Sequence, residues 1–224
     1  MITSWSLAML FLSPATVVAG SQDGQAIHRN VDGSQLRISQ HPCDAAGHRI
    51  IRVELRSIPS SAFKTVLQRS QSCSAYPRGS GHLQDVDADG LMEYVELAYC
   101  GAGPNCWRQI FKIDSQQGRA DLFFEGGFSR FRTIAGFYVS SGRASCCSWE
   151  HAIYRLPLRS RTITAQDLAY RISVEAPAME GEAATCLITR PEGEAWVPID
   201  LNIEPLRKLC HHYGEKVVTN PANH

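Results

Sequence analysis

The chain has 224 residues, of which 44% are hydrophobic and 20% charged, and its 22 Lys and Arg balance 22 Asp and Glu. This composition excludes an intrinsically disordered chain, and the length allows one domain or two small ones. With no net positive charge there is no basic field for a phosphate backbone or an anionic membrane, so we expect no nucleic-acid partner.

The first 19 residues predict a signal peptide. Residues 1–19 carry no charged side chain, contain an apolar run over residues 7–12, and end in Val17-Val18-Ala19. These small residues suit cleavage after Ala19. Serines, threonines and Pro14 interrupt the run, which disfavours the alternative of a membrane span. We therefore expect a periplasmic or secreted protein.

Short alternating or β-branched runs predict a mainly β fold of antiparallel sheets. In residues 50–55, Ile51, Val53 and Leu55 alternate with Arg52 and Glu54, as in a half-buried strand. The runs before residue 160 lie at 36–39, 49–55, 62–67, 94–100, 107–113, 131–139 and 150–156.

The last third of the chain predicts a small β-plus-α lobe. Its strands are expected at 170–174, 184–189 and 195–201, with residues 191–194 as a hairpin turn. A first helical turn is expected at 164–167. The better helix, at 203–213, precedes Gly214 and places Ile203, Leu206 and Cys210 on one face, so it should cover a sheet.

These patterns predict four segments. A β domain at 20–160 follows the signal peptide 1–19 and contains an acidic loop at 85–96. Residues 161–217 form the small lobe, either separate or part of the same domain. Residues 218–224 are expected to be a flexible tail because they offer little to bury.

The acidic loop predicts a metal site. Asp85, Asp87 and Asp89 alternate and are followed by Gly90, a residue that permits a sharp turn. Adjacent carboxylates repel one another unless a cation lies among them, and this oxygen-rich set suits calcium. The expected ligands are Asp85, Asp87, Asp89, the backbone carbonyl of Leu91, Glu93 and, as a further contributor, Glu96. The alternative is a solvated acidic turn.

The sequence around the loop favours a hairpin over an EF-hand. Pro77, Gly79 and Gly81 prevent a continuous entering helix, and Gly101 and Pro104 leave about two turns for an exiting one. The alternation in residues 94–100 is typical of a strand. We therefore expect the loop to lead into a β-hairpin.

The loop resembles the calcium hairpin of integrin-like FG-GAP or VCBS repeats. The similarity covers residues 80–115, through Asp-x-Asp-x-Asp-Gly-x-x-Glu, the run Tyr-Val-Glu-Leu and the turn Gly-Ala-Gly-Pro-Asn. The family commonly has Asp at the ninth position, where Glu93 retains a carboxylate. A full propeller is not expected from one loop.

A longer similarity reaches small envelope proteins of Gram-negative bacteria that carry a single such loop. It rests on strands before the loop and an aromatic-rich run from Phe123 to Tyr154. Some of these are similar to the immunity proteins of xanthomonad killing systems. That resemblance implies a protein partner, here a cell-wall-degrading enzyme.

The eight cysteines, an even number, predict disulfides and an oxidising compartment. Cys100 and Cys106 bracket a glycine-rich turn, and a Cys186–Cys210 bond would attach the last helix to a sheet. Zinc binding by Cys210 with the two following histidines is the alternative. The remaining four are Cys43, Cys73, Cys146 and Cys147. The adjacent pair would point to opposite faces of an extended strand, which favours two different disulfide partners.

The sequence indicates a non-catalytic binding or inhibitory module. It contains no GxSxG, HExxH, P-loop or GxGxxG motif. Cys147 and His151 would lie roughly 13 Å apart on one strand, too far to hydrogen-bond. The alternative is an envelope hydrolase with an unrecognised site. Aromatic residues near Arg130 and Arg132 form either a binding face or, as we favour, core.

Overall fold

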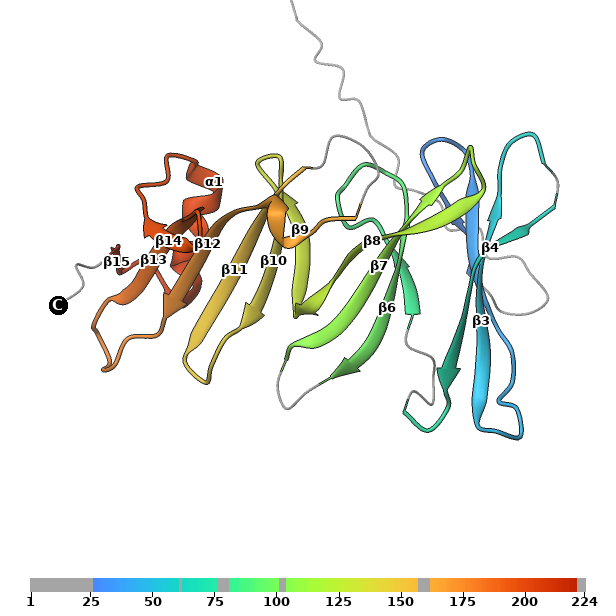
Figure 1. The fold of residues 1–224 in the computed structure, drawn as a ribbon, viewed down its shortest axis with the longest axis horizontal. Helices are drawn as coiled ribbons and strands as arrows, with labels where there is room; N and C mark the ends of the chain where they lie inside the picture. The colour runs from blue at the N-terminus through green and yellow to red at the C-terminus, as the bar shows by residue number, and fades with distance from the viewer. Residues whose placement is uncertain (1–25, 61, 76–80, 101–103, 157–161, 221–224) are drawn as a thin grey trace, which may run out of the picture.

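The computed structural model describes residues 26–60, 62–75, 81–100, 104–156 and 162–220. The predicted signal peptide and residues 221–224 of the predicted tail lie outside these ranges. Three sheets follow one another along the chain, from the N-terminal sheet at the right of Figure 1 to the C-terminal sheet at the left. The prediction of a mainly β, antiparallel fold with a short C-terminal helix is confirmed.

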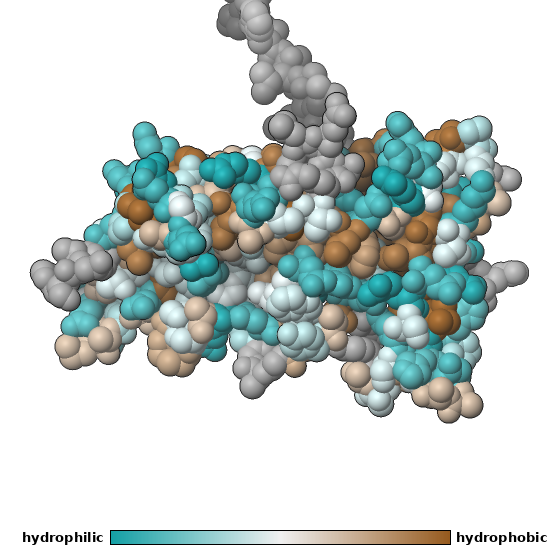
Figure 2. All heavy atoms as spheres, in the orientation of Figure 1, coloured by the Kyte–Doolittle hydropathy of each residue, from teal (hydrophilic) through white to brown (hydrophobic). Residues whose placement is uncertain are grey.

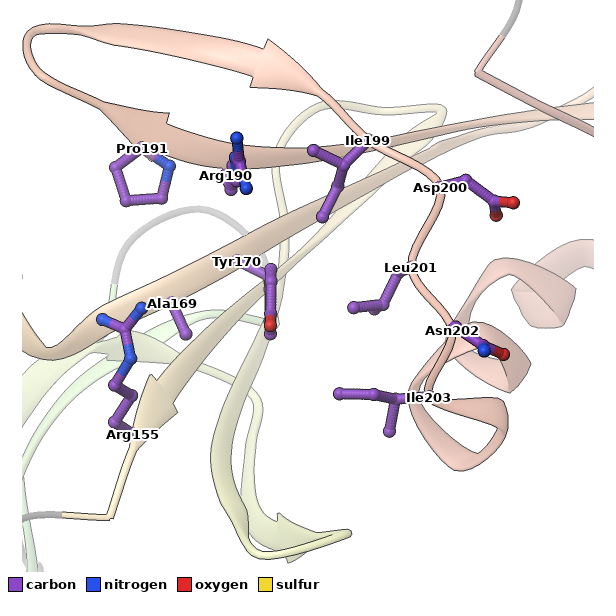
Figure 3. Close-up of a pocket in the computed structure, with 10 residues that line it drawn as sticks. All are labelled: Arg155, Ala169, Tyr170, Arg190, Pro191, Ile199, Asp200, Leu201, Asn202 and Ile203. Carbon is purple, nitrogen blue, oxygen red and sulfur yellow. The ribbon is translucent and has the colours of Figure 1, made fainter.

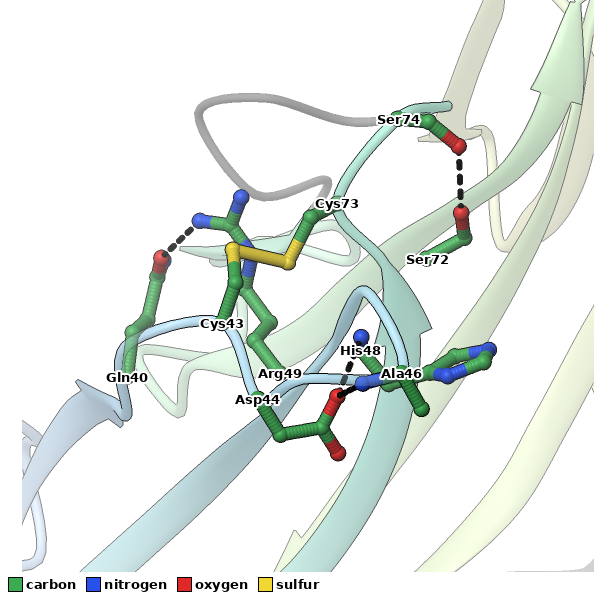
Figure 4. Close-up of a disulfide and its surroundings, with 9 residues drawn as sticks. All are labelled: Gln40, Cys43, Asp44, Ala46, His48, Arg49, Ser72, Cys73 and Ser74. Carbon is green, nitrogen blue, oxygen red and sulfur yellow. Dashed lines mark hydrogen bonds between the residues drawn. A yellow bond between two sulfur atoms is a disulfide. The ribbon is translucent and has the colours of Figure 1, made fainter.

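The first sheet is a four-stranded meander in which each strand pairs with the next. Its strands are β1 (His28–Arg29), β2 (Gln35–Gln40), β3 (His48–Arg56) and β4 (Lys64–Ser72). In β3 the predicted alternation is confirmed, since Ile51, Val53 and Leu55 are buried. The Cys43–Cys73 disulfide joins the turn before β3 to the end of β4 (Figure 4).

The second sheet is also a four-stranded antiparallel meander. It contains β5 (Gly81–Gln84), β6 (Glu93–Cys100), β7 (Cys106–Asp114) and β8 (Arg119–Phe128). The predicted loop joins β5 to β6, and β6 and β7 form the predicted hairpin, with Tyr94 opposite Phe111 and Cys100 opposite Cys106.

The third sheet contains seven strands. Six lie in the order β14-β13-β12-β11-β10-β9, and β15 pairs in parallel with β13. Their bounds are β9 (Arg130–Ile134), β10 (Phe137–Arg143), β11 (Ser148–Arg155), β12 (Leu168–Glu175), β13 (Ala184–Glu192), β14 (Ala195–Pro198) and β15 (Val217–Thr219). Because β11 pairs with β12, this sheet continues across residue 160.

Two predictions in the third sheet are wrong. The single strand expected at 131–139 is two strands, because Ala135 and Gly136 adopt φ angles of +50° and +78° and turn the chain back. The flexible tail was expected to begin at 218, but Val218 and Thr219 pair with β13.

Helical structure occurs at the two predicted places. A 3₁₀ turn, η1 (Ala165–Asp167), precedes β12. The C-terminal helix has an α-helical start, α1 (Glu204–Arg207), and a 3₁₀ continuation, η2 (Lys208–Tyr213). Leu206 and Cys210 are buried within the core of the third sheet, as the helix face predicts.

Two aromatic-rich cores lie where the sheets meet. Phe123, Phe124 and Phe128 of β8 pack with Phe131 and Tyr138 of the third sheet. The first and second sheets share another core, in which Tyr94 and Phe111 pack with β2 and β3 residues. On the side of the molecule drawn in Figure 2, hydrophobic side chains also reach the surface where the first and second sheets meet. The phenylalanines are therefore core, as we favoured.

Three disulfides brace the protein: Cys43–Cys73, Cys100–Cys106 and Cys186–Cys210. The last two match the expected pairs, and the Cys186–Cys210 bond contradicts the zinc alternative at Cys210. Cys146 and Cys147 are exposed free thiols, so the expectation that they pair with two different cysteines is wrong. Three disulfides nevertheless indicate a compartment outside the cytosol. In the described part of the chain, no helix has the length and apolarity needed to cross a membrane.

Removing either the Cys43–Cys73 or the Cys100–Cys106 disulfide should destabilise the fold, and the size of the loss should depend on the length of the loop that the bond closes. The Cys43–Cys73 bond spans 30 residues and the Cys100–Cys106 bond spans 6. Chain entropy gives roughly 3.5 kcal/mol for the longer loop and roughly 2 kcal/mol for the shorter. Denaturant unfolding of the two Cys→Ser double variants should show the larger loss for Cys43 and Cys73. The reverse order would mean that native contacts, not chain entropy, set the difference.

Candidate metal centre

The loop of residues 85–92 is held by its own backbone. Asp85 accepts hydrogen bonds from the N–H groups of Asp89, at 3.2 Å, and Gly90, at 3.0 Å. Asp89 accepts one from the N–H of Leu91 at 2.8 Å. Gly90 has a φ of +84°, and a Cβ atom there would lie 2.3 Å from Val31, so glycine is required. The loop is therefore closed tightly before β6 begins.

The first sheet braces the outer side of this loop. The N–H of Val31 donates to the carbonyl of Gly90 at 3.1 Å, and Asn30 accepts from the N–H of Met92 at 3.0 Å. Asn30 is itself buried. The loop conformation thus depends on a segment some sixty residues earlier in the chain.

Asp85, Asp87 and Asp89 come together as the sequence predicts. One carboxylate oxygen from each lies within 4.8 Å of the other two, so these three residues could hold a metal ion. Asp87 is the most buried, with its side chain 7% exposed, and its Oδ1 has no hydrogen-bond partner. Hard divalent cations prefer carboxylate oxygens, so the donor set and the unpartnered oxygen fit a cation.

A lysine already neutralises part of this charge. Lys112 of β7 lies with its Nζ 2.5 Å from Asp87 Oδ2 and 4.0 Å from Asp89 Oδ2. The hydroxyl of Tyr138, from β10, donates to the same Asp87 oxygen at 2.8 Å. Burial opposes ionisation of Asp87, but these two donors outweigh it and hold the pKa of its carboxyl below its usual value. Burial, and then the neighbouring aspartates, raise the pKa of Asp89.

Glu93 forms the inner wall of the site. It is fully buried, and its Oε2 accepts a hydrogen bond from the N–H of Val86 at 2.9 Å. Burial raises the pKa of Glu93 to about 8, and the charges of Asp87 and Asp89 act in the same direction. Glu93 lies outside the group of three aspartates, and its role as a ligand, like that of the Leu91 carbonyl, stays a prediction.

The structure does not bring Glu96 to the aspartates. Its two carboxylate oxygens accept hydrogen bonds from Arg69 and Gln71 of β4, both at 2.8 Å. Glu96 is buried between the first and second sheets by this pairing.

The sequence analysis did not identify Lys112 and Tyr138 as residues of the site. The position of Lys112 in a strand beside the loop was a signal for the first, and nothing local pointed to the second.

Apart from the acidic loop, the protein has a cavity beside the C-terminal helix. A cavity of about 560 Å³ is lined by residues of β11, β12 and β13 and by the segment leading to α1 (Figure 3). Ile199, Leu201 and Ile203 provide apolar walls, whereas the side chain of Asp200 points away from the other lining residues.

Comparisons with known proteins leave the chain without an assigned family. No protein-family model matches it, and no curated protein sequence matches it. A solved structure described as a Xanthomonas type IV secretion system related protein aligns with it at a TM-score of 0.49 and 13% identity. The alignment covers 84% of this chain and 98% of that one. A likeness at this level does not identify a function.

Replacing Lys112 should reveal whether a cation can take its place. In Lys112→Met, the largely buried Asp87 loses its ion pair, and we expect a loss of about 2–4 kcal/mol of unfolding free energy in chelator. A divalent ion bound by the three aspartates should recover much of that loss. Thermal melts with and without divalent cation measure this. Lys64→Met, at an exposed β4 position, is the control. An equal loss under both conditions would show that a divalent ion does not take the place of Lys112.

Proposed function

We propose that the protein is an exported, non-catalytic binding or inhibitory module whose fold is stabilised by calcium. The observation that carries this proposal is the hairpin of β6 and β7. At one end it begins in the acidic loop, and at the other it is closed by the Cys100–Cys106 disulfide. An exposed aromatic pair lies beside that disulfide.

The aromatic pair has the character of a binding anchor. Tyr99 and Trp107 stack with ring centroids 6.0 Å apart and planes 5° apart. Tyr99 is 59% exposed and Trp107 is 36% exposed. Large aromatic side chains contribute disproportionately to protein–protein interfaces, because they bury much area at a low entropic cost.

The hairpin end that carries this pair is held against the third sheet. The side-chain amide of Asn105 donates to the carbonyl of Arg143 at 2.6 Å, and its oxygen accepts the N–H of Arg143 at 2.8 Å. Two hydrogen bonds to Arg143 of β10 and one disulfide restrain the ends of β6 and β7 here. Such preorganisation favours binding because little freedom is lost when the partner arrives.

Calcium is the cation that the loop suits best. The donors are oxygens in a loop of Asp-x-Asp-x-Asp-Gly form, the pattern that provides calcium ligands in other proteins. Because the loop also contacts the first sheet and Tyr138, calcium would stabilise the fold and the hairpin together.

A protein partner agrees with these features. The resemblance to single-loop envelope proteins implies that the partner is a cell-wall-degrading enzyme, which the module would inhibit. The disulfides and the features of residues 1–19 support a periplasmic or secreted location.

Calcium should raise the melting temperature. A ligand bound by the native state alone adds roughly 2.7 kcal/mol at a hundredfold excess over Kd, which corresponds to several degrees. Scanning calorimetry in calcium and in chelator measures the shift. Asp89→Asn should reduce it, because that side chain belongs to the three-aspartate group.

Asp121→Asn is the matched control for this experiment. Asp121 is a carboxylate of β8 whose side chain is 42% exposed, as is that of Asp89. The control should keep the full calcium shift. If wild type melts identically in calcium and chelator, the calcium part of the proposal is wrong.

Removing the partly exposed tryptophan should weaken partner binding more than it weakens the fold. We expect Trp107→Ala to lose at least tenfold in affinity for the captured enzyme with only a small fall in melting temperature, which reflects its lost packing on Tyr99. Capture from an envelope extract of the producing cell, followed by calorimetric titration and an inhibition assay, measures this. Met179→Ala, which removes another exposed apolar side chain, is the control. Turnover of cell-wall fragments by the protein alone would favour the alternative of an envelope hydrolase.

A further inference from the structure

A cavity with polar walls, separate from the one in Figure 3, lies between the third sheet and η2. It has a volume of about 400 Å³, within the range of small-molecule sites. Strands β9, β10 and β11 form one wall, and residues of η2 form the other. The basic residues that line it are Arg130, Arg132, His151, Lys208, His211 and His212. None of the described lining residues is acidic.

The basic side chains lack counter-charges. Within the described ranges, Arg130, Arg132 and Lys208 have no carboxylate at salt-bridge distance. His211 pairs with Glu215 at 3.1 Å, but that glutamate side chain is 93% exposed. Positive charge is therefore concentrated here in a protein whose formal net charge is zero.

One buried polar side chain in the wall is only half satisfied. His151 is 4% exposed, and its Nδ1 lies 2.8 Å from the hydroxyl oxygen of Ser141. Its Nε2 is buried and has no hydrogen-bond partner. The Nε of Arg132 is likewise buried without a partner. A buried donor without a partner destabilises the protein, so both groups would gain from a ligand that supplies an acceptor.

The electrostatics of the wall favour the binding of an anion. Burial lowers the pKa of His151 to about 4, and His212 and Arg132 add to the effect. Burial and Arg130 also lower the pKa values of Arg132 and His212. The imidazole of His151 is thus neutral at pH 7. When the Ser141 hydroxyl donates to its Nδ1, its Nε2 carries the proton and can donate to an acceptor.

We propose that this cavity is a binding site for an oxyanion, the carboxylate or phosphate group of a small ligand. Arg130, Arg132 and Lys208 supply the positive charge, and His151 donates from Nε2. Trp149, whose ring packs against that of His212 with centroids 4.4 Å apart, lines the cavity and offers an apolar surface to the rest of the ligand. The site does not depend on the calcium loop or on the proposed protein partner.

The test is an NMR titration of the purified full chain, with the ring C–H signals of His151 as the reporter. Inorganic phosphate and succinate are the two probes, with sodium chloride at equal ionic strength as the reference. We expect a saturable shift with at least one probe, and a rise in the pKa of His151 when that probe is bound. Saturation by phosphate alone would assign a phosphate ligand, and saturation by succinate alone would assign a carboxylate.

Arg132→Gln and Lys208→Gln should each weaken probe binding at least tenfold, because each removes a charge from the wall. Arg190→Gln, which removes an exposed arginine of β13, should leave the affinity unchanged. Shifts no larger than those of sodium chloride would overturn the proposal, and so would equal affinities in Arg132→Gln and Arg190→Gln. Because no partner enzyme or calcium enters this experiment, its result is separate from that of the proposed function.

Discussion

The neutralisation of buried acid at the turn between β5 and β6 is the constraint on which the arrangement of the sheets depends. The side chain of Asp87 in this loop is 7% exposed, and Glu93, at the start of β6, is 2% exposed, so these two carboxyl groups cannot be buried without compensation. The compensation comes from other parts of the fold. Lys112 is supplied by β7 of the same sheet and Tyr138 by β10 of the third. Asn30 and Val31 reach the loop from the first sheet, so the loop joins all three sheets.

The local parts of this architecture could be predicted from the sequence, because their causes are local. Alternation indicated β3 and β7, and a glycine-rich turn between two cysteines indicated the Cys100–Cys106 bond. The strand β8 was missed because its pairing with β7 shifts register next to Ile110, so Phe123 and Phe124 are buried in succession and the alternation is lost. The turn at Ala135 was missed because alanine rarely adopts a positive φ.

The same distinction applies to the metal centre. The aspartate spacing lies within five residues, so it was visible in the sequence. The partners of Asp87 were not, since Lys112 is 25 residues away and Tyr138 is 51. Glu96 shows the opposite case. It stands at the twelfth loop position, where an EF-hand has a ligand, but strand pairing carries it toward Arg69 and Gln71. The position of the Glu96 side chain depends on how the first and second sheets pack, and residue spacing in the sequence does not predict it.

The three disulfides follow one another along the chain without nesting or crossing. Residues 43–73, 100–106 and 186–210 are separate intervals, so each bond closes within a segment that needs no cysteine from outside it. A chain that enters an oxidising compartment from its N-terminus can therefore complete its bonds in order, each as soon as its own segment has crossed. Cys146 and Cys147 emerge after the second bond is closed and before the third can form. Cys186 therefore emerges while these two thiols are available and before Cys210 can reach it, and they compete with Cys210 for the third bond.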